Sequence, residues 1–183
     1  MLAGAGVAVA GSMVTGGLTS QPIGHYEFCK ANPAECSVRS KGVRPQQLTQ
    51  ALLDTLKSVN ASVNHAIKPM NDLDLYGKDE VWAYPDGAGD CEDYVLEKRR
   101  ALNQRGLSYA NLLITVVRKP DGEGHAVLTV RTDGGDLVLD NLTDKVKDWN
   151  DTGYRFLKRQ SSEHSGRWVS IREGGTSLVG AVQ

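Results

Sequence analysis

The sequence lacks a surplus of charge of either sign, and it has few cysteines and few long apolar runs. Its 21 lysines and arginines oppose 22 aspartates and glutamates, so no global electrostatic field favours a nucleic-acid partner. Only one apolar run stands out, at the N-terminus, and it is too short and too glycine-rich for a convincing membrane span. With 183 residues, 40% hydrophobic, the chain is expected to fold as a single domain around one core.

The apolar N-terminal run, MLAGAGVAVAGSMVTGGL, carries no charge and is followed by polar residues. These features predict an export signal over residues 1–19, with the domain at residues 20–174. The run lacks the lysine or arginine that normally follows Met1 in such signals. An apolar N-terminal tail without structure is the alternative interpretation.

Two of the three cysteines are close together, in the segment FCKANPAEC, whereas Cys91 stands alone. A disulfide between Cys29 and Cys36 is predicted, and it would persist only in an oxidising compartment such as the bacterial periplasm. Two reduced thiols are one alternative. Zinc binding with His25 is another, but no second CxxC or HxxxH element completes four ligands.

Helical patterns dominate the first half of the predicted domain. Residues 20–44 show no clear period and are interpreted as an irregular arm. From Pro45 to Ile67, apolar residues recur at steps of three and four, which predicts a helix that ends before Pro69. Residues 70–90 are expected to form a long surface connection. A second helix is predicted from Asp90, as N-cap with Asp93 three residues later, to Gly106.

The second half of the chain favours strands. The runs LLITVVR at 112–118, HAVLTVR at 125–131 and DLVLDNL at 136–142 are separated by turn-forming residues and predict an antiparallel meander. Further strands are expected near 154–160 and 167–171, followed by a flexible tail at 175–183. The predicted fold class is therefore α+β, with N-terminal helices packed on an antiparallel sheet.

Cys91, His125 and Asp140 form a candidate catalytic triad. Cys91 lies in the first turn of a predicted helix, where free backbone N–H groups and the helix dipole lower a thiol pKa. If Arg131 faces either Gly134 or Asp136 across the turn, His125 and Asp140 share one face of the sheet, which the Cys91 helix is expected to cover.

Each of these three residues also has a structural interpretation. Cys91 could be a buried small side chain, His125 a residue at the edge of a loop and Asp140 part of a turn. His25, His65 and His164 compete for the role of base, but none begins a strand beside a strand that carries a carboxylate.

The motifs around these residues, GDCEDYVLEKRRAL, GHAVLTV and LVLDN, resemble the bacterial transglutaminase-like cysteine proteinase family over residues 70–171. The resemblance implies a papain-like fold with Cys91 as nucleophile, His125 as base and acid, and Asp140 as orienting group. It implies a periplasmic endopeptidase that clips a surface adhesin and releases biofilm cells, with an inner-membrane regulator.

The resemblance also implies calcium binding by the acids that flank the nucleophile, Asp90 and Glu92, which are oxygen ligands of the kind calcium takes. Asp72 and Asp74 could add ligands, although the segment departs from EF-hand spacing at Ala83. The alternative is that Asp90 only caps its helix.

Two further points concern the chemistry. Trp82 and Tyr84 are candidate donors to an oxyanion, with packing under the connection as the alternative role. The same triad could perform transglutamination or amide hydrolysis, because only the acyl acceptor differs. An inactive calcium-responsive binding module is a further alternative. The chemistry itself needs no cofactor.

Overall fold

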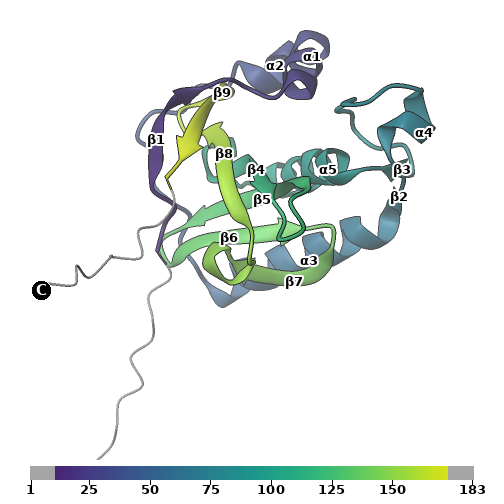
Figure 1. Cartoon of the computed structure of the whole chain (residues 1–183). Helices are drawn as coiled ribbons and strands as arrows, with labels where there is room; N and C mark the ends of the chain where they lie inside the picture. The colour runs from purple at the N-terminus through teal and green to yellow at the C-terminus, as the bar shows by residue number, and fades with distance from the viewer. Residues whose placement is uncertain (1–10, 173–183) are drawn as a thin grey trace, which may run out of the picture.

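Three runs rich in leucine and valine form the centre of the sheet in the computed structural model, which describes residues 11–172 (Figure 1). They are β4 (Leu112–Arg118), β5 (Gly124–Thr132) and β6 (Gly135–Asp140), and each pairs with the next in antiparallel orientation. The predicted meander is confirmed, with boundaries within two residues of those expected from the sequence.

Four more strands extend the sheet to seven, in the order β1-β9-β8-β4-β5-β6-β7, in which β1 (Thr15–Thr19) is one edge. β7 (Thr143–Asp148) continues the meander at one edge. The chain then passes through the short helix η2 (Trp149–Asp151) to β8 (Arg155–Ser161), which pairs with β4, and β9 (His164–Ile171) follows. The crossing from β7 to β8 brings the segment before β8 near the end of β6.

Two helices, α3 (Gln50–Ala66) and α5 (Cys91–Gln104), pack against one face of this sheet (Figure 1). Leu56 and Val59 of α3 and Leu102 of α5 are buried there, together with Leu128 of β5. Val117, Val127 and Val138 alternate with the residues of that core and belong to a second cluster, on the opposite face.

The first of these helices begins five residues later than the apolar pattern predicts. Thr49 is its N-cap and accepts a hydrogen bond from the Leu52 N–H. The backbone of Gln46 instead bonds to Arg131 and Asp133 at the turn between β5 and β6. Long-range backbone bonds, which no helical period reveals, therefore hold residues 45–48 outside the helix.

The N-terminal arm is helical rather than irregular. It contains α1 (Ile23–Ala31) and α2 (Pro33–Cys36), and the Cys29–Cys36 disulfide joins them, with 5.5 Å between the Cα atoms. Both helices are too short to show a clear apolar period. Because the two sulfurs are bonded to each other, His25 beside them does not complete a zinc site.

Removal of this disulfide should lower the stability of the chain. The cross-link joins residues with a sequence separation of 7. By restricting the unfolded chain, it is expected to raise the free energy of unfolding by about 2–3 kcal/mol. We expect the double variant Cys29→Ser/Cys36→Ser to melt about 5–10 °C lower than the wild type. Cys91→Ser, which removes the free thiol, is the matched control and should melt near the wild type. Equal melting temperatures with and without dithiothreitol would contradict the prediction.

The ordered sheet extends into the segment assigned to the export signal. β1 (Thr15–Thr19) pairs with β9, the Met13 side chain is buried, and the Met13 N–H donates to Asp136. The folded part therefore starts before residue 20, because this segment supplies the edge strand of the sheet. Residues 1–10 and the predicted flexible tail at 175–183 lie outside the described residues.

The connection at residues 70–90 has structure of its own. Its ends pair as the short parallel strands β2 (Lys68–Pro69) and β3 (Ala88–Gly89), and α4 (Asp72–Tyr76) lies between them. A further short helix, η1 (Tyr109–Asn111), precedes β4. Among residues 11–172, none of the helices has the length and apolarity needed to cross a bilayer.

Candidate active site

Cys91 is the first residue of α5, as the sequence predicts. Its side chain is partly exposed and lines two hollows, one of about 510 Å³ and one of about 700 Å³. His125 and Asp90 also line both of them. The thiol therefore lies where two surface depressions meet, a place that an extended chain can reach from either side.

His125 and Asp140 are joined by a hydrogen bond of 2.9 Å between Nε2 and Oδ1. Arg131 faces Asp136 across the β5–β6 turn, which is one of the two registers expected from the sequence. The side chains of His125 and Asp140 are both buried. An ionised carboxylate only accepts hydrogen bonds, so neutral His125 carries its proton on Nε2 and leaves Nδ1 as an acceptor.

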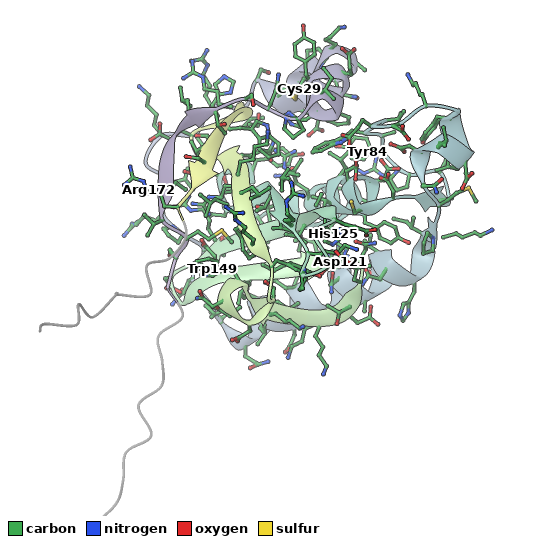
Figure 2. The ribbon with its side chains drawn as sticks, in the orientation of Figure 1. Cys29, Tyr84, Asp121, His125, Trp149 and Arg172 are labelled. Carbon is green, nitrogen blue, oxygen red and sulfur yellow. A yellow bond between two sulfur atoms is a disulfide. The ribbon has the colours of Figure 1, made fainter. Side chains whose placement is uncertain are left out.

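The predicted packing of the Cys91 helix across the His125–Asp140 face is wrong. In β5, His125 alternates with Ala126 and Leu128, which belong to the core beneath the helices. The imidazole therefore projects from the opposite face. Cys91 reaches the end of β5 through the first turn of α5, where the Ala126 N–H bonds to its sulfur. Figure 2 labels His125 near the centre of the molecule.

The carboxyl groups of Glu92 and Asp90 lie beside the Cys91 thiol. Sγ donates to Oε2 of Glu92 at 2.8 Å. Burial raises the pKa of this thiol well above its ordinary value, and the charges of Glu92 and Asp90 raise it further. These carboxylates oppose the helix dipole, so the first turn alone does not activate the thiol.

Asp72, Asp90 and Glu92 form an acidic cluster beside Cys91, with ligand oxygens that all lie within 4.8 Å of one another. Asp72 and Glu92 are buried, and Oδ1 of Asp72 and Oδ1 of Asp90 have no hydrogen-bond partner among the described residues. Asp74, which the sequence also suggested, is not part of the cluster. Clustered carboxylates with free oxygens suit a hard cation such as calcium.

Asp90 takes the N-cap position of α5 but makes no capping hydrogen bond with its side chain. The predicted N-cap position of Asp90 is therefore confirmed, but its side chain does not cap the helix. The Asp90 carboxyl belongs to the acidic cluster, and burial and the charge of Glu92 raise its pKa to about 8. The carboxyl of Asp93 accepts instead from the Ala83 N–H in the preceding loop.

A raised carboxyl pKa means that the folded chain loses stability as this group ionises. Between about pH 4 and 8, folded Asp90 holds a proton that the unfolded chain has released. We therefore expect Asp90→Asn to be more stable than the wild type in calcium-free buffer at pH 8, and the difference to shrink towards pH 4.

Urea denaturation in EGTA at several pH values would measure this. His25 and Lys98, whose pKa values burial lowers to about 4 and about 7, change stability in the opposite direction. Both residues are present in the two proteins, so their contributions cancel in the difference. A difference that does not change with pH would contradict the expectation.

The two candidate oxyanion donors, Trp82 and Tyr84, lie in different surroundings. Trp82 lines the larger hollow together with Cys91, and its buried Nε1 has no hydrogen-bond partner among the described residues. Tyr84 lines neither hollow beside Cys91 and bonds to Glu35, with Arg100 stacked on its ring. Trp82 therefore remains a candidate donor, and Tyr84 has the packing role.

The competing histidines lie in other environments. His25 is buried against the disulfide and bonds to Gln21 and Gln160. His65 is exposed and pairs with Asp144 at 3.0 Å.

The side chain of Tyr154 does reach the site and donates to Asp140 at 2.6 Å. The sequence showed Tyr154 only as one of several aromatic residues in the C-terminal segment, and no local pattern connects it to Asp140.

Comparisons with known proteins identify the family and the fold of the chain. The model of a family described as bacterial transglutaminase-like cysteine proteinase matches residues 15–176. Calcium-bound LapG of Legionella pneumophila is 25% identical, with a TM-score of 0.56, and the match covers 73% of this chain and 76% of that one.

Two further LapG structures from the same organism are similar. One is 26% identical, with a TM-score of 0.54 and coverage of 63% of this chain and 67% of that one. The EGTA-treated form is 22% identical, with a TM-score of 0.55 and coverage of 70% of both chains, and it supports the fold alone. A search of curated protein sequences gave no match. The predicted transglutaminase-like fold and family are confirmed.

Proposed function

Because the chain belongs to the bacterial transglutaminase-like cysteine proteinase family, and is thus a cysteine peptidase, we propose that Cys91, His125 and Asp140 are its catalytic triad. The Cys91 thiolate attacks a peptide carbonyl, His125 protonates the leaving amine, and water then releases the acyl group from Cys91. Asp140 holds the imidazole. The backbone N–H of Cys91 and the indole of Trp82 are the proposed oxyanion donors.

One observation carries this proposal. Nε2 of His125 donates to Asp140, so Nδ1 is the ring nitrogen left to accept a proton, and Cys91 lines the same two hollows as His125. A base oriented by a carboxylate, beside a nucleophile at the first turn of a helix, is the arrangement that cysteine peptidases need.

We further propose that the acidic cluster, Asp72, Asp90 and Glu92, binds calcium. Its free carboxylate oxygens and its burial support a cation, and one of the similar LapG structures is calcium-bound. A cation held by Glu92 would compete with the thiol for the Glu92 carboxylate, which accepts a hydrogen bond from Cys91. The cation would thereby favour the thiolate without taking part in bond cleavage.

The substrate and the compartment are also proposals. The Cys29–Cys36 disulfide supports an oxidising compartment, and we propose the bacterial periplasm. An export signal that leaves β1 intact would have to be cleaved before Met13, which is buried. Because the family is a proteinase family, the proposed substrate is a protein. By the family resemblance of the sequence motifs, we propose a surface adhesin as that protein and an inner-membrane regulator as a partner.

Thiol labelling tests the proposed triad without knowledge of the substrate. Purified protein, without reductant and with calcium, is treated with iodoacetamide at pH 6 and analysed by intact mass. A single fast adduct on Cys91 is expected, because the disulfide protects Cys29 and Cys36. Slow labelling that follows the pH profile of an ordinary thiol would contradict the proposed function.

A further inference from the structure

Tyr154 contacts both Asp140 and His125, although it lies outside the helix α5 and the two strands β5 and β6 that supply the proposed triad. Its hydroxyl donates to Oδ2 of Asp140 at 2.6 Å. Its ring meets the His125 ring edge-on, with centroids 5.7 Å apart and planes at 75°. A single side chain therefore touches the base and the group that orients it.

The bond from Tyr154 completes the hydrogen bonding of Asp140. Oδ1 already accepts from His125 and from the Leu142 N–H at 3.0 Å. Oδ2 has Tyr154 as its partner, and the Asp140 side chain is only 4% exposed. Without the phenol, one oxygen of a buried carboxylate would have no donor, and the carboxylate would be free to rotate.

The same three bonds decide the charge of Asp140. Burial raises the pKa of its carboxyl, but the bonds from His125, Tyr154 and the Leu142 N–H outweigh that effect, so the pKa is below its ordinary value. Asp140 is therefore ionised at neutral pH and can accept from Nε2 of His125. Tyr154 supports this state as a neutral donor, because burial and the Asp140 bond raise its own pKa.

The backbone before β8 holds Tyr154 in this position. The Tyr154 N–H donates to Oγ1 of Thr152, and Gly153 between them has a φ of +74°, a conformation that glycine adopts at little cost. Phe156, two residues later, packs in the cluster on the same face of the sheet. The phenol is thus presented by a fixed turn rather than by a loose loop.

We propose that Tyr154 is a positioning residue of this active site. It fixes the Asp140 carboxylate through its hydroxyl and the His125 ring through its edge-on contact. Both interactions keep the proton of neutral His125 on Nε2 and leave Nδ1 to accept the thiol proton. This inference rests on the proposed roles of Cys91, His125 and Asp140.

The test uses Tyr154→Phe, which keeps the ring and removes only the hydroxyl. Long-range ¹H–¹⁵N spectra of the imidazoles report where neutral His125 carries its proton, and they need no substrate. Both proteins carry Cys91→Ala for these spectra, so that no thiolate pairs with an imidazolium. With Tyr154 present we expect the Nε2–H form of His125, and with Tyr154→Phe a mixture of both tautomers. Tyr26→Phe, which removes an exposed hydroxyl from α1, is the matched control.

A second readout uses p-nitrophenyl acetate as an acylating probe. Cys91 takes the acetyl group and releases p-nitrophenolate, and water then hydrolyses the thioester with His125 as base. We expect deacylation in Tyr154→Phe to slow about tenfold, the effect of one lost charge-assisted hydrogen bond. The melting temperatures of all variants report whether they fold. Tyr154→Leu loses both the hydroxyl and the ring, so the difference between its rate and that of Tyr154→Phe measures the effect of the ring contact.

The outcomes separate this inference from the proposed function. An unchanged tautomer and an unchanged deacylation rate in Tyr154→Phe, with Cys91→Ala and His125→Ala inactive, would overturn the role of Tyr154 alone. Turnover that survives in Cys91→Ala would overturn the proposed triad, and with it a positioning role for Tyr154.

Discussion

Replacement of His125 with alanine should slow the labelling of Cys91 by iodoacetamide at pH 6 by about a hundredfold or more. The thiolate is the reactive form, and an isolated thiol with an ordinary pKa is only about 0.3% ionised at this pH. An imidazolium beside the sulfur would keep much of the thiol ionised. Removal of His125 takes away that cation and leaves burial and the Glu92 carboxyl to disfavour the thiolate.

The control for this variant is His65→Ala. His65 is exposed and pairs with Asp144, so its loss should leave the labelling rate unchanged. Denaturation with guanidinium exposes the thiol in each protein and should make the rates equal, which shows that the difference comes from the folded site. Equal rates in folded wild type and folded His125→Ala would remove the basis for the proposed ion pair.

Calcium should raise the melting temperature of the chain by roughly 5–10 °C at a concentration about a hundredfold above its dissociation constant. Binding to the folded state alone at that excess raises the free energy of unfolding by about 2.7 kcal/mol. Each kcal/mol raises the melting temperature of a domain of this size by about 2–4 °C. The cluster is formed only when Asp72 in α4 meets Asp90 and Glu92 at the start of α5. The unfolded chain therefore has no comparable site.

Asp72→Asn should abolish most of this shift, because it removes a charged ligand and keeps the shape of the side chain. Asp74→Asn is the matched control, since Asp74 lies in the same short helix but outside the cluster. Magnesium should stabilise less, because it requires octahedral geometry and loses its water reluctantly. Equal melting temperatures in calcium and in EGTA would exclude the cluster as a calcium site.

The sequence suggested all three residues of the proposed triad, because local rules govern the helix and strands that carry them. A break in apolar periodicity and the acids around Cys91 marked the start of a helix, and α5 begins at that cysteine. The alternation of side chains along a strand related His125 to Asp140 through the register of one short turn, and the structure has one of the two registers considered.

The errors arose where distant segments of the chain meet. Helix α5 was placed on the face that carries His125 and Asp140, but strand periodicity does not say which of two faces a helix covers. Asp90 takes the predicted N-cap position, but its sequence neighbours do not show that its carboxyl meets the buried carboxylate of Asp72, which comes from another helix. β1 was assigned to an export signal, because its small, uncharged residues follow an apolar run and do not distinguish the end of a signal from an edge strand.

The sequence by itself determined the helix with Cys91 at its first turn, the three central strands and the pairing of Cys29 with Cys36, because each depends on residues near one another along the chain. Only the tertiary structure decided that Asp72 joins the acidic cluster, that Cys91 approaches His125 around the end of β5, and that Tyr154 bonds to Asp140. These contacts depend on how the sheet and helices pack, and that packing is set by the burial of side chains from the whole chain.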